Sequence, residues 1–197
     1  CIKEKVNCFR NNPNLGIISA TLYEMNTPNK IQLRGCSFNH FFGSTSDIIS
    51  KETHYDYLSG ASLLVSKECM TTIKKWDPEF FLNYEDADLC FRAKKKGFDI
   101  ESCDKAIVYH KQSITFNNEI KKRSSISDTI RLKSRIIFAK KHNLPTIGII
   151  LSLLISFYLR IIRIKFKEAK EILFLIIKIN QPISFFVTKP KKNDQTN

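Results

Sequence analysis

The first half of the chain alternates apolar runs with polar, turn-forming segments. Residues 16–23 form a continuous run of aliphatic and small residues, typical of a buried strand, and residues 31–36 predict a second short strand interrupted by Gly35. Residues 3–12 predict a short helix that precedes both strands. Residues 39–53 have no regular period and are rich in Ser, Gly and Phe, so they predict a mobile surface loop.

Small residues stand directly before an aliphatic strand in the segment from Tyr57 to Ser66. Gly60 and Ala61 would let backbone amides approach a ligand closely. A tight bend between two core strands is the alternative explanation for these small residues. Ser66 then predicts the N-cap of a short helix that ends near Lys75.

A helical pattern follows over residues 85–96, and Gly97 ends it. Its first turn is acidic, where the helix dipole favours negative charge. Asp88 and Arg92 are four residues apart on this helix, so their side chains can pair.

Two further strands are predicted after this helix, over residues 98–101 and 106–110. Asp104 lies in the turn expected between them. His110 ends the second strand, a position where a lone histidine usually has a structural role.

The stretch from Trp76 to Arg92, WDPEFFLNYEDADLCFR, is the candidate chemical centre. Large aromatic side chains flank its five carboxylates, which are Asp77, Glu79, Glu85, Asp86 and Asp88. Carboxylates between large apolar groups are partly desolvated, which shifts their affinity for protons and metals. The pattern therefore predicts acid–base or metal chemistry here rather than a solvated acidic surface.

The last third of the chain is basic and apolar. Residues 127–142 predict a helix that mixes basic and aliphatic positions, and the 13 residues 147–159 carry no charge. About 20 residues are needed to span a bilayer, so this run is short. From Ile162 a helical apolar stripe has Lys and Arg opposite it, as in helices that lie on anionic membranes. A membrane-surface anchor, a spanning or re-entrant helix, and helices packed on the folded body all stay open, and residues 185–197 predict a frayed polar end.

The net charge of +13 belongs entirely to the end of the chain. Residues 1–110 contain 14 Lys and Arg against 14 Asp and Glu, whereas residues 111–197 contain 18 against 5. A neutral body with a basic tail predicts an anionic partner for the tail. Nucleic acid is disfavoured, because the basic residues share faces with aliphatic runs rather than with stacking aromatics.

The six cysteines form no CxxC pair and are scattered through apolar surroundings. This usage predicts buried free thiols in a reducing compartment rather than a disulfide framework or a zinc site.

Three segments together resemble the second half of the catalytic domain of inverting family 2 glycosyltransferases of the GT-A fold, in their rhamnosyltransferase-like bacterial branch. They are GASLLVS (60–66), WDPEFFLNYEDADLCFRAKKKG (76–97) and AIVYH (106–110). The resemblance covers roughly residues 5–115. The block EDADLCFR, with two Phe before it, is its most specific part.

The resemblance implies transfer of a sugar from a dTDP- or UDP-linked donor to a hydroxyl of a membrane-linked glycan or polyprenyl-linked acceptor. Inverting transfer needs a general base beside the attacking hydroxyl. By their positions in the family motif, Asp86 is implied to be that base and Glu85 its orienting neighbour. Gly60, Ala61 and Trp76 match segments that bind the sugar and the acceptor.

The family also implies a divalent cation, Mg²⁺ or Mn²⁺, that neutralises the leaving diphosphate. In several relatives an Asp-x-Asp motif and a histidine after the base helix hold this metal, and His110 matches the histidine. The letters Asp86-Ala87-Asp88 lie instead in the base motif at a helix start. The resemblance therefore implies that the donor-binding half, with its Asp-x-Asp, precedes Cys1, and that these residues are inactive without it.

The fold expected from these observations is α/β. Residues 1–118 are the C-terminal, acceptor-side half of a Rossmann-like GT-A catalytic domain, and residues 119–197 are a basic, apolar helical tail. The tail is expected to associate with an anionic membrane surface, at the cytoplasmic face of the plasma membrane.

Two other functions fit the same residues. One is a membrane-surface binding module in which the acidic cluster is structural. The other is a metal-dependent hydrolase that uses Glu85, Asp86 and His110, although no second histidine lies near that cluster.

Overall fold

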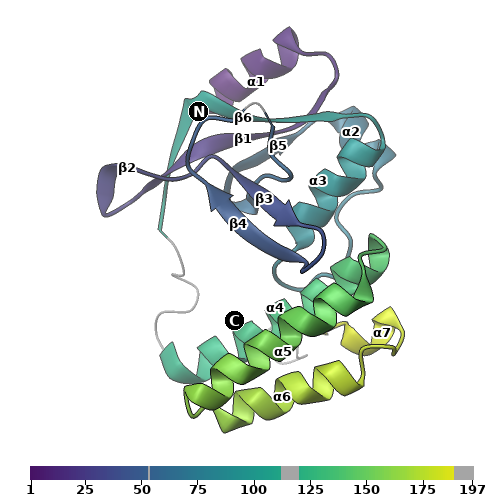
Figure 1. Cartoon of the computed structure of the whole chain (residues 1–197). Coiled ribbons are helices and arrows are strands. Elements are labelled where there is room, and N and C mark those ends of the chain that lie inside the picture. The colour runs from purple at the N-terminus through teal and green to yellow at the C-terminus, as the bar shows by residue number, and fades with distance from the viewer. Residues whose placement is uncertain (53, 112–119, 189–197) are drawn as a thin grey trace, which may run out of the picture. The chain divides into compact units, whose positions relative to one another are not determined.

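The computed structural model describes residues 1–52, 54–111 and 120–188, and these form two compact units (Figure 1). The first unit comprises residues 1–38, 45–77 and 85–117. The second comprises residues 39–44, 78–84 and 118–197. A sheet with helices forms the first unit and helices dominate the second, so the predicted class, an α/β domain followed by a helical region, is confirmed.

The sheet of the first unit is built around β1 (Leu15–Glu24), which is the predicted buried run. Along β1, β6 (Asp99–His110) pairs in parallel from Leu15 to Glu24. The antiparallel partners are β5 (Leu63–Val65), beside residues 17–19, and β2 (Thr27–Leu33), beside residues 22–24. The side chains of β1 are buried from residue 15 to residue 22, because helices pack on the faces of the sheet from which they project.

Helices pack against this sheet. The N-terminal α1 (Ile2–Asn11), predicted over residues 3–12, contacts β1 and β6. The partly buried Cys8 and Phe9 of α1 pack on a cluster of buried residues, which are Leu15, Ile18, Ala20, Cys103 and Ala106. Both α2 (Lys67–Thr72), capped by Ser66 as predicted, and α3 (Glu85–Lys95) also contact β1.

The turn predicted at Asp104 is wrong, because β6 is one continuous strand. Its register against β1 shifts where Ala20 faces Cys103 and Thr21 faces Ile107, so three residues bulge out of the pairing. Asp104 lies in this bulge and forms ion pairs with Arg34 and with Lys51. The polar residue therefore marks a bulge whose charge is neutralised locally, and the strand continues beyond it.

The segment predicted as a mobile loop is also partly regular. Two strands, β3 (Gly35–Asn39) and β4 (Ser44–Ile48), form a separate two-stranded sheet. The strand predicted at 31–36 is therefore divided between β2 and β3. A Cβ on Gly35 would lie 2.2 Å from the Tyr55 ring, so close packing requires glycine there.

Within residues 120–188 the helical unit contains four helices. They are α4 (Ile120–Lys141), α5 (Thr146–Ile162), α6 (Phe166–Ile177) and the short α7 (Ile183–Phe186). The first three correspond to the three predicted apolar helical patterns, and they lie side by side in Figure 1. The prediction of a frayed end from residue 185 is wrong for its first residues, because Phe186 is fully buried. Residues 189–197, the rest of that predicted end, lie outside the described residues.

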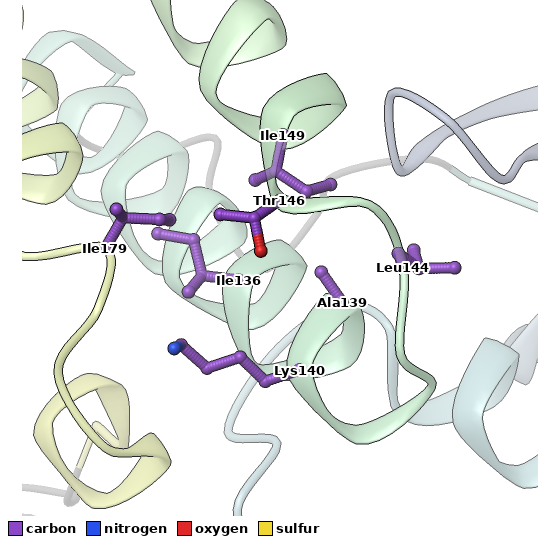
Figure 2. A pocket seen from close by; sticks show the side chains of 7 residues that line it. All are labelled: Ile136, Ala139, Lys140, Leu144, Thr146, Ile149 and Ile179. Atoms are coloured by element: carbon purple, nitrogen blue, oxygen red, sulfur yellow. The ribbon is translucent and has the colours of Figure 1, made fainter.

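A small cavity of about 30 Å³ lies between the helices of this unit and is shown in Figure 2. Aliphatic side chains surround it, including Ile136 from α4, Ile149 from α5 and Ile179 after α6. A space of this size holds about one water molecule. We therefore regard it as a packing gap rather than a ligand site.

The cysteines are free thiols, as predicted, and four of the six are buried. Cys1 is exposed, contrary to the prediction. Burial raises the pKa of the Cys36 thiol to about 12, so this thiol is not a nucleophile at neutral pH.

Candidate active site

The acidic start of α3 forms the candidate site. Glu85, Asp86 and Asp88 all lie in the first turn of this helix, where its dipole stabilises negative charge. Asp86 accepts two backbone hydrogen bonds, from the Gly60 N–H to Oδ2 at 3.0 Å and from the Ala87 N–H to Oδ1 at 2.8 Å. These bonds fix the orientation of the carboxylate.

Gly60, which donates this hydrogen bond, begins η1 (Gly60–Ser62), a 3₁₀ turn capped by the Ser59 side chain. Gly60 and Ala61 are exposed, and the substrate-binding role predicted for them remains a prediction. The close approach predicted for the Gly60 amide is therefore directed at Asp86 of the same protein. Lys5, a buried residue of α1, holds the far end of this turn by donating to the Ser62 carbonyl and hydroxyl at 3.2 and 3.1 Å.

Both carboxyl groups at the helix start have raised pKa values. Burial raises the pKa of Asp86, and the backbone hydrogen bonds from Gly60 and Ala87 oppose this rise. Burial also raises the pKa of Glu85, and the neighbouring charge of Asp86 raises it further. Two adjacent carboxyls with raised pKa values can accept and hold protons nearer neutral pH than ordinary Asp and Glu.

Glu85 has an unsatisfied oxygen. Its Oε2 is buried and has no hydrogen-bond partner among the residues that the structure describes. A buried carboxyl oxygen without a partner is costly, and such atoms are often satisfied by a ligand. The oxygen is therefore well suited to accept a hydrogen bond from a substrate hydroxyl.

A network within the helical unit holds the segment that leads into Glu85. The Tyr84 hydroxyl donates to the Gly43 carbonyl at 2.7 Å and accepts from Arg135 Nε of α4 at 3.0 Å. The Ser134 hydroxyl donates to the Leu82 carbonyl at 2.8 Å. Helix α4 therefore holds residues 82–84 within the helical unit.

Sequence reasoning did not identify Arg135 as part of this network. Its partner Tyr84 is 51 residues away in the chain, and nothing local distinguishes Arg135 from the other basic residues of α4. The sequence around Tyr84, the partner of Arg135, does contain one local signal. Asn83 and Tyr84 both have left-handed backbones, with φ of 62° and 67°, and Asn is a residue that tolerates this conformation.

The pairing predicted between Asp88 and Arg92 is confirmed. Arg92 Nε donates to Asp88 Oδ2 at 2.7 Å, and the Asp88 side chain is almost fully buried. Arg92 Nη1 also donates to the backbone carbonyls of Ile73 and Lys75. Asp88 and Arg92 therefore connect α3 to the turn that precedes Trp76.

The other predicted site residues lie on separate elements. Trp76 is on the loop after α2, with 43% of its surface exposed. His110 ends β6, and its Nδ1 lies 3.2 Å from Gln32 Oε1 of β2. The roles predicted for Trp76 and His110 remain predictions.

The described residues do not fit a complete metal centre. Within 1–52, 54–111 and 120–188, no three His, Cys, Asp or Glu side chains are grouped so that they could hold a metal ion. His110 alone has the chemistry of a single ligand, because Gln32 can fix its tautomer through Nδ1.

The raised pKa of Glu85 gives a prediction about stability. A carboxyl that binds its proton more tightly when folded makes the folded state less stable as pH rises above the ordinary carboxyl pKa of about 4. Glu85→Gln should therefore raise the melting temperature at pH 7 by roughly 2–4 °C, equivalent to about 1 kcal/mol. The gain should vanish at pH 4, as measured by thermal unfolding at several pH values.

The exposed Glu68 of α2 supplies the control for this experiment. Glu68→Gln should give no comparable gain at pH 7. Equal gains from both variants would show that overall charge, rather than burial of Glu85, sets the pH dependence.

Residues 1–138 match the model of the family described as glycosyltransferase like family 2. The match covers more than half of the chain, so the protein belongs to this family. The mixed α/β unit with its central sheet agrees with a GT-A-like domain followed by a helical region. The match also extends past residue 118 through most of α4, including Ser134 and Arg135. A comparison with curated proteins finds no match.

Proposed function

We propose that this chain is the acceptor-side part of an inverting glycosyltransferase whose general base is Asp86. The proposal rests on the arrangement of carboxylates at the N-terminal end of α3, in a protein that belongs to this family. There a carboxylate with a raised pKa is fixed by the Gly60 amide, next to Glu85 with an unpartnered buried oxygen. A purely membrane-binding module would not require this arrangement.

In the proposed reaction an acceptor hydroxyl attacks the anomeric carbon of the donor from the face opposite the leaving group. The bond from the acceptor oxygen to the anomeric carbon forms as the bond from that carbon to the diphosphate breaks, and the nucleoside diphosphate leaves with the electron pair. Asp86 takes the hydroxyl proton as the oxygen becomes acidic. Glu85 Oε2 accepts a hydrogen bond from the acceptor and orients it.

The donor is proposed to be a dTDP- or UDP-sugar, with a rhamnosyl donor in keeping with the bacterial branch that the motifs resemble. The acceptor is a hydroxyl of a glycan or of a polyprenyl-linked saccharide. Trp76, Gly60 and Ala61 are proposed to line the acceptor pocket, and His110 to contribute to a Mg²⁺ or Mn²⁺ site. The rest of that site would belong to a donor-binding half with the Asp-x-Asp motif, without which transfer is not expected.

The direct test is a transfer assay with the full-length enzyme. The purified protein is incubated with dTDP-rhamnose or a UDP-hexose, Mg²⁺ and a polyprenyl-linked saccharide. We expect release of the nucleoside diphosphate and a product with inverted anomeric configuration. A product with retained configuration, or hydrolysis of the donor that is equally fast without acceptor, would overturn the proposal.

We also propose that the helical unit binds the cytoplasmic face of the plasma membrane through α5. This helix is apolar on both sides. Six apolar side chains form a stripe along its solvent-facing side, and each is 40–63% exposed. They are Ile147, Leu151, Leu154, Ile155, Tyr158 and Ile162. An exposed apolar stripe on a basic unit is typical of helices that lie in the headgroup region of anionic membranes.

No helix in the described ranges is both long enough and apolar enough to cross a bilayer. The proposed mode of association is attachment to one face of the membrane, with the exposed stripe of α5 lying along it.

Removing part of the stripe should weaken membrane association. Burying a half-exposed side chain of this size contributes roughly 1 kcal/mol. The combined change Leu154→Ser, Ile155→Ser and Tyr158→Ser should therefore reduce flotation with vesicles rich in phosphatidylglycerol by at least tenfold. The matched control changes exposed apolar residues of the first unit, Met25→Ser, Ile49→Ser and Ile107→Ser. Equal losses in both variants would contradict a role for the α5 stripe.

A further inference from the structure

A second pocket in the helical unit has a composition that the proposed reaction does not use. It opens between α4 and α6 and encloses about 750 Å³. Three lysines line it, Lys133 from α4 and Lys167 and Lys170 from α6. Its apolar lining comes from Ile130, Phe174 and Leu175.

The charge of this pocket is positive. Glu171 is the acidic residue in its lining, and its Oε2 already accepts a hydrogen bond from the Thr129 hydroxyl. At the edge of the pocket, Thr188 Oγ1 is buried and has no hydrogen-bond partner within residues 1–52, 54–111 and 120–188. Three ammonium groups and a hydroxyl donor suit a phosphate monoester or diester.

The cationic and apolar parts of the pocket follow one another along α6. Lys167, Lys170 and Phe174 are spaced by three and four residues, which places them on one face of the helix. Phe174 is 51% exposed, and Ile177, one turn further on, is 68% exposed. The lysines and an exposed apolar surface therefore lie next to each other on the same face of α6.

We infer that this pocket binds an amphiphile that carries a phosphate group. The lysines hold the phosphate, and the hydrocarbon chain lies against Ile130, Phe174 and Leu175. Two sources offer this chemistry: a diacyl phospholipid of the bilayer, and a prenyl phosphate such as a lipid carrier of glycans. Binding requires no turnover, so this inference does not depend on the role proposed for Asp86.

The experiment measures binding calorimetrically with soluble probes, using the full chain. Dihexanoyl phosphatidic acid represents the diacyl source, farnesyl phosphate the prenyl source, and inorganic phosphate the headgroup alone. We expect at least one amphiphile to bind at least tenfold more tightly than inorganic phosphate. The tighter of the two identifies the source.

The variant Lys133→Gln, Lys167→Gln, Lys170→Gln should weaken amphiphile binding at least tenfold. Its control removes the same charge from exposed positions of the first unit, through Lys3→Gln, Lys95→Gln and Lys96→Gln, and should bind within twofold of the unchanged protein. Phe174→Ser should weaken the amphiphiles while leaving inorganic phosphate unchanged. Because this second variant keeps every lysine, it separates the apolar contribution from the charge.

Two results would overturn the inference: equal losses in both lysine variants, which would show general charge attraction, or equal affinity for inorganic phosphate and both amphiphiles. Asp86→Asn should bind the amphiphiles like the unchanged protein. Loss of transfer with binding retained would therefore concern only the active site, and loss of binding in the lysine variant would concern only this pocket.

Discussion

Asp86→Asn should lower the rate of sugar transfer by at least 100-fold while leaving donor binding unchanged. A positioned general base typically contributes about 10²–10⁴-fold to the rate. The amide has nearly the same shape and can still accept the Gly60 N–H through its oxygen, although it gives up the bond from the Ala87 N–H, so the fold should be preserved. The measurements are kcat in the full-length enzyme and donor affinity by calorimetry. Retained turnover would show that another group removes the proton.

A second test changes Gly60, whose N–H donates a hydrogen bond to Asp86, and leaves the base itself in place. Gly60→Pro replaces the N–H that binds Asp86 Oδ2 by the ring Cδ, so it removes this hydrogen bond and pushes the carboxylate away from the turn. Ser59 before it has φ of −66° and ψ of 136°, which is compatible with a following proline. A hydrogen bond to a carboxylate lowers its pKa, so deleting this bond should raise the pKa of Asp86.

The acidic limb of the pH–rate profile should then move to higher pH in Gly60→Pro. Gly60→Ala keeps the N–H and is the matched control, because its added Cβ would lie at an ordinary 3.6 Å from the Asp86 Cβ. Identical shifts in the two variants would mean that the side chain, rather than the lost hydrogen bond, disturbs the base.

Local patterns were sufficient to predict much of the candidate site. The apolar run that became β1 and the acid-first helix that became α3 follow from side-chain period and helix capping, which involve near neighbours. The pair of Asp88 with Arg92 follows from a spacing of four residues. Such features are encoded over a few positions and can be inferred from one sequence.

The features that were missed depend on residues distant in the chain. Asp104 resembles a turn residue, yet its partner Arg34 is 70 residues away and allows it to lie in a bulge of β6. β4 has no buried position and therefore shows no clear alternation. Tyr84 and Arg135 meet only when the chain is folded, so nothing near either residue predicts the contact.

Replacing Arg92 by Met should cost the protein about 3–5 kcal/mol of stability. This change leaves Asp88, whose side chain is only 2% exposed, without the guanidinium that lies 2.7 Å from its Oδ2. Removing one partner of a buried ion pair is strongly destabilising, because the remaining buried charge loses its opposite charge. Arg92→Met also removes the donor to the Lys75 carbonyl, in a turn where Lys74 and Lys75 have left-handed φ of 60° and 65°.

Chemical denaturation should show this loss, and the exposed Lys95→Met on the same helix should change stability by less than about 0.5 kcal/mol. The double variant Arg92→Met, Asp88→Leu separates the two contributions of Arg92. It contains neither charge of the pair, so it should recover much of the loss if burial of the Asp88 carboxylate without Arg92 is the main cost. If the double variant is no more stable than Arg92→Met, the hydrogen bonds from Arg92 to the strained turn carry the stability, and the ion pair with Asp88 contributes little.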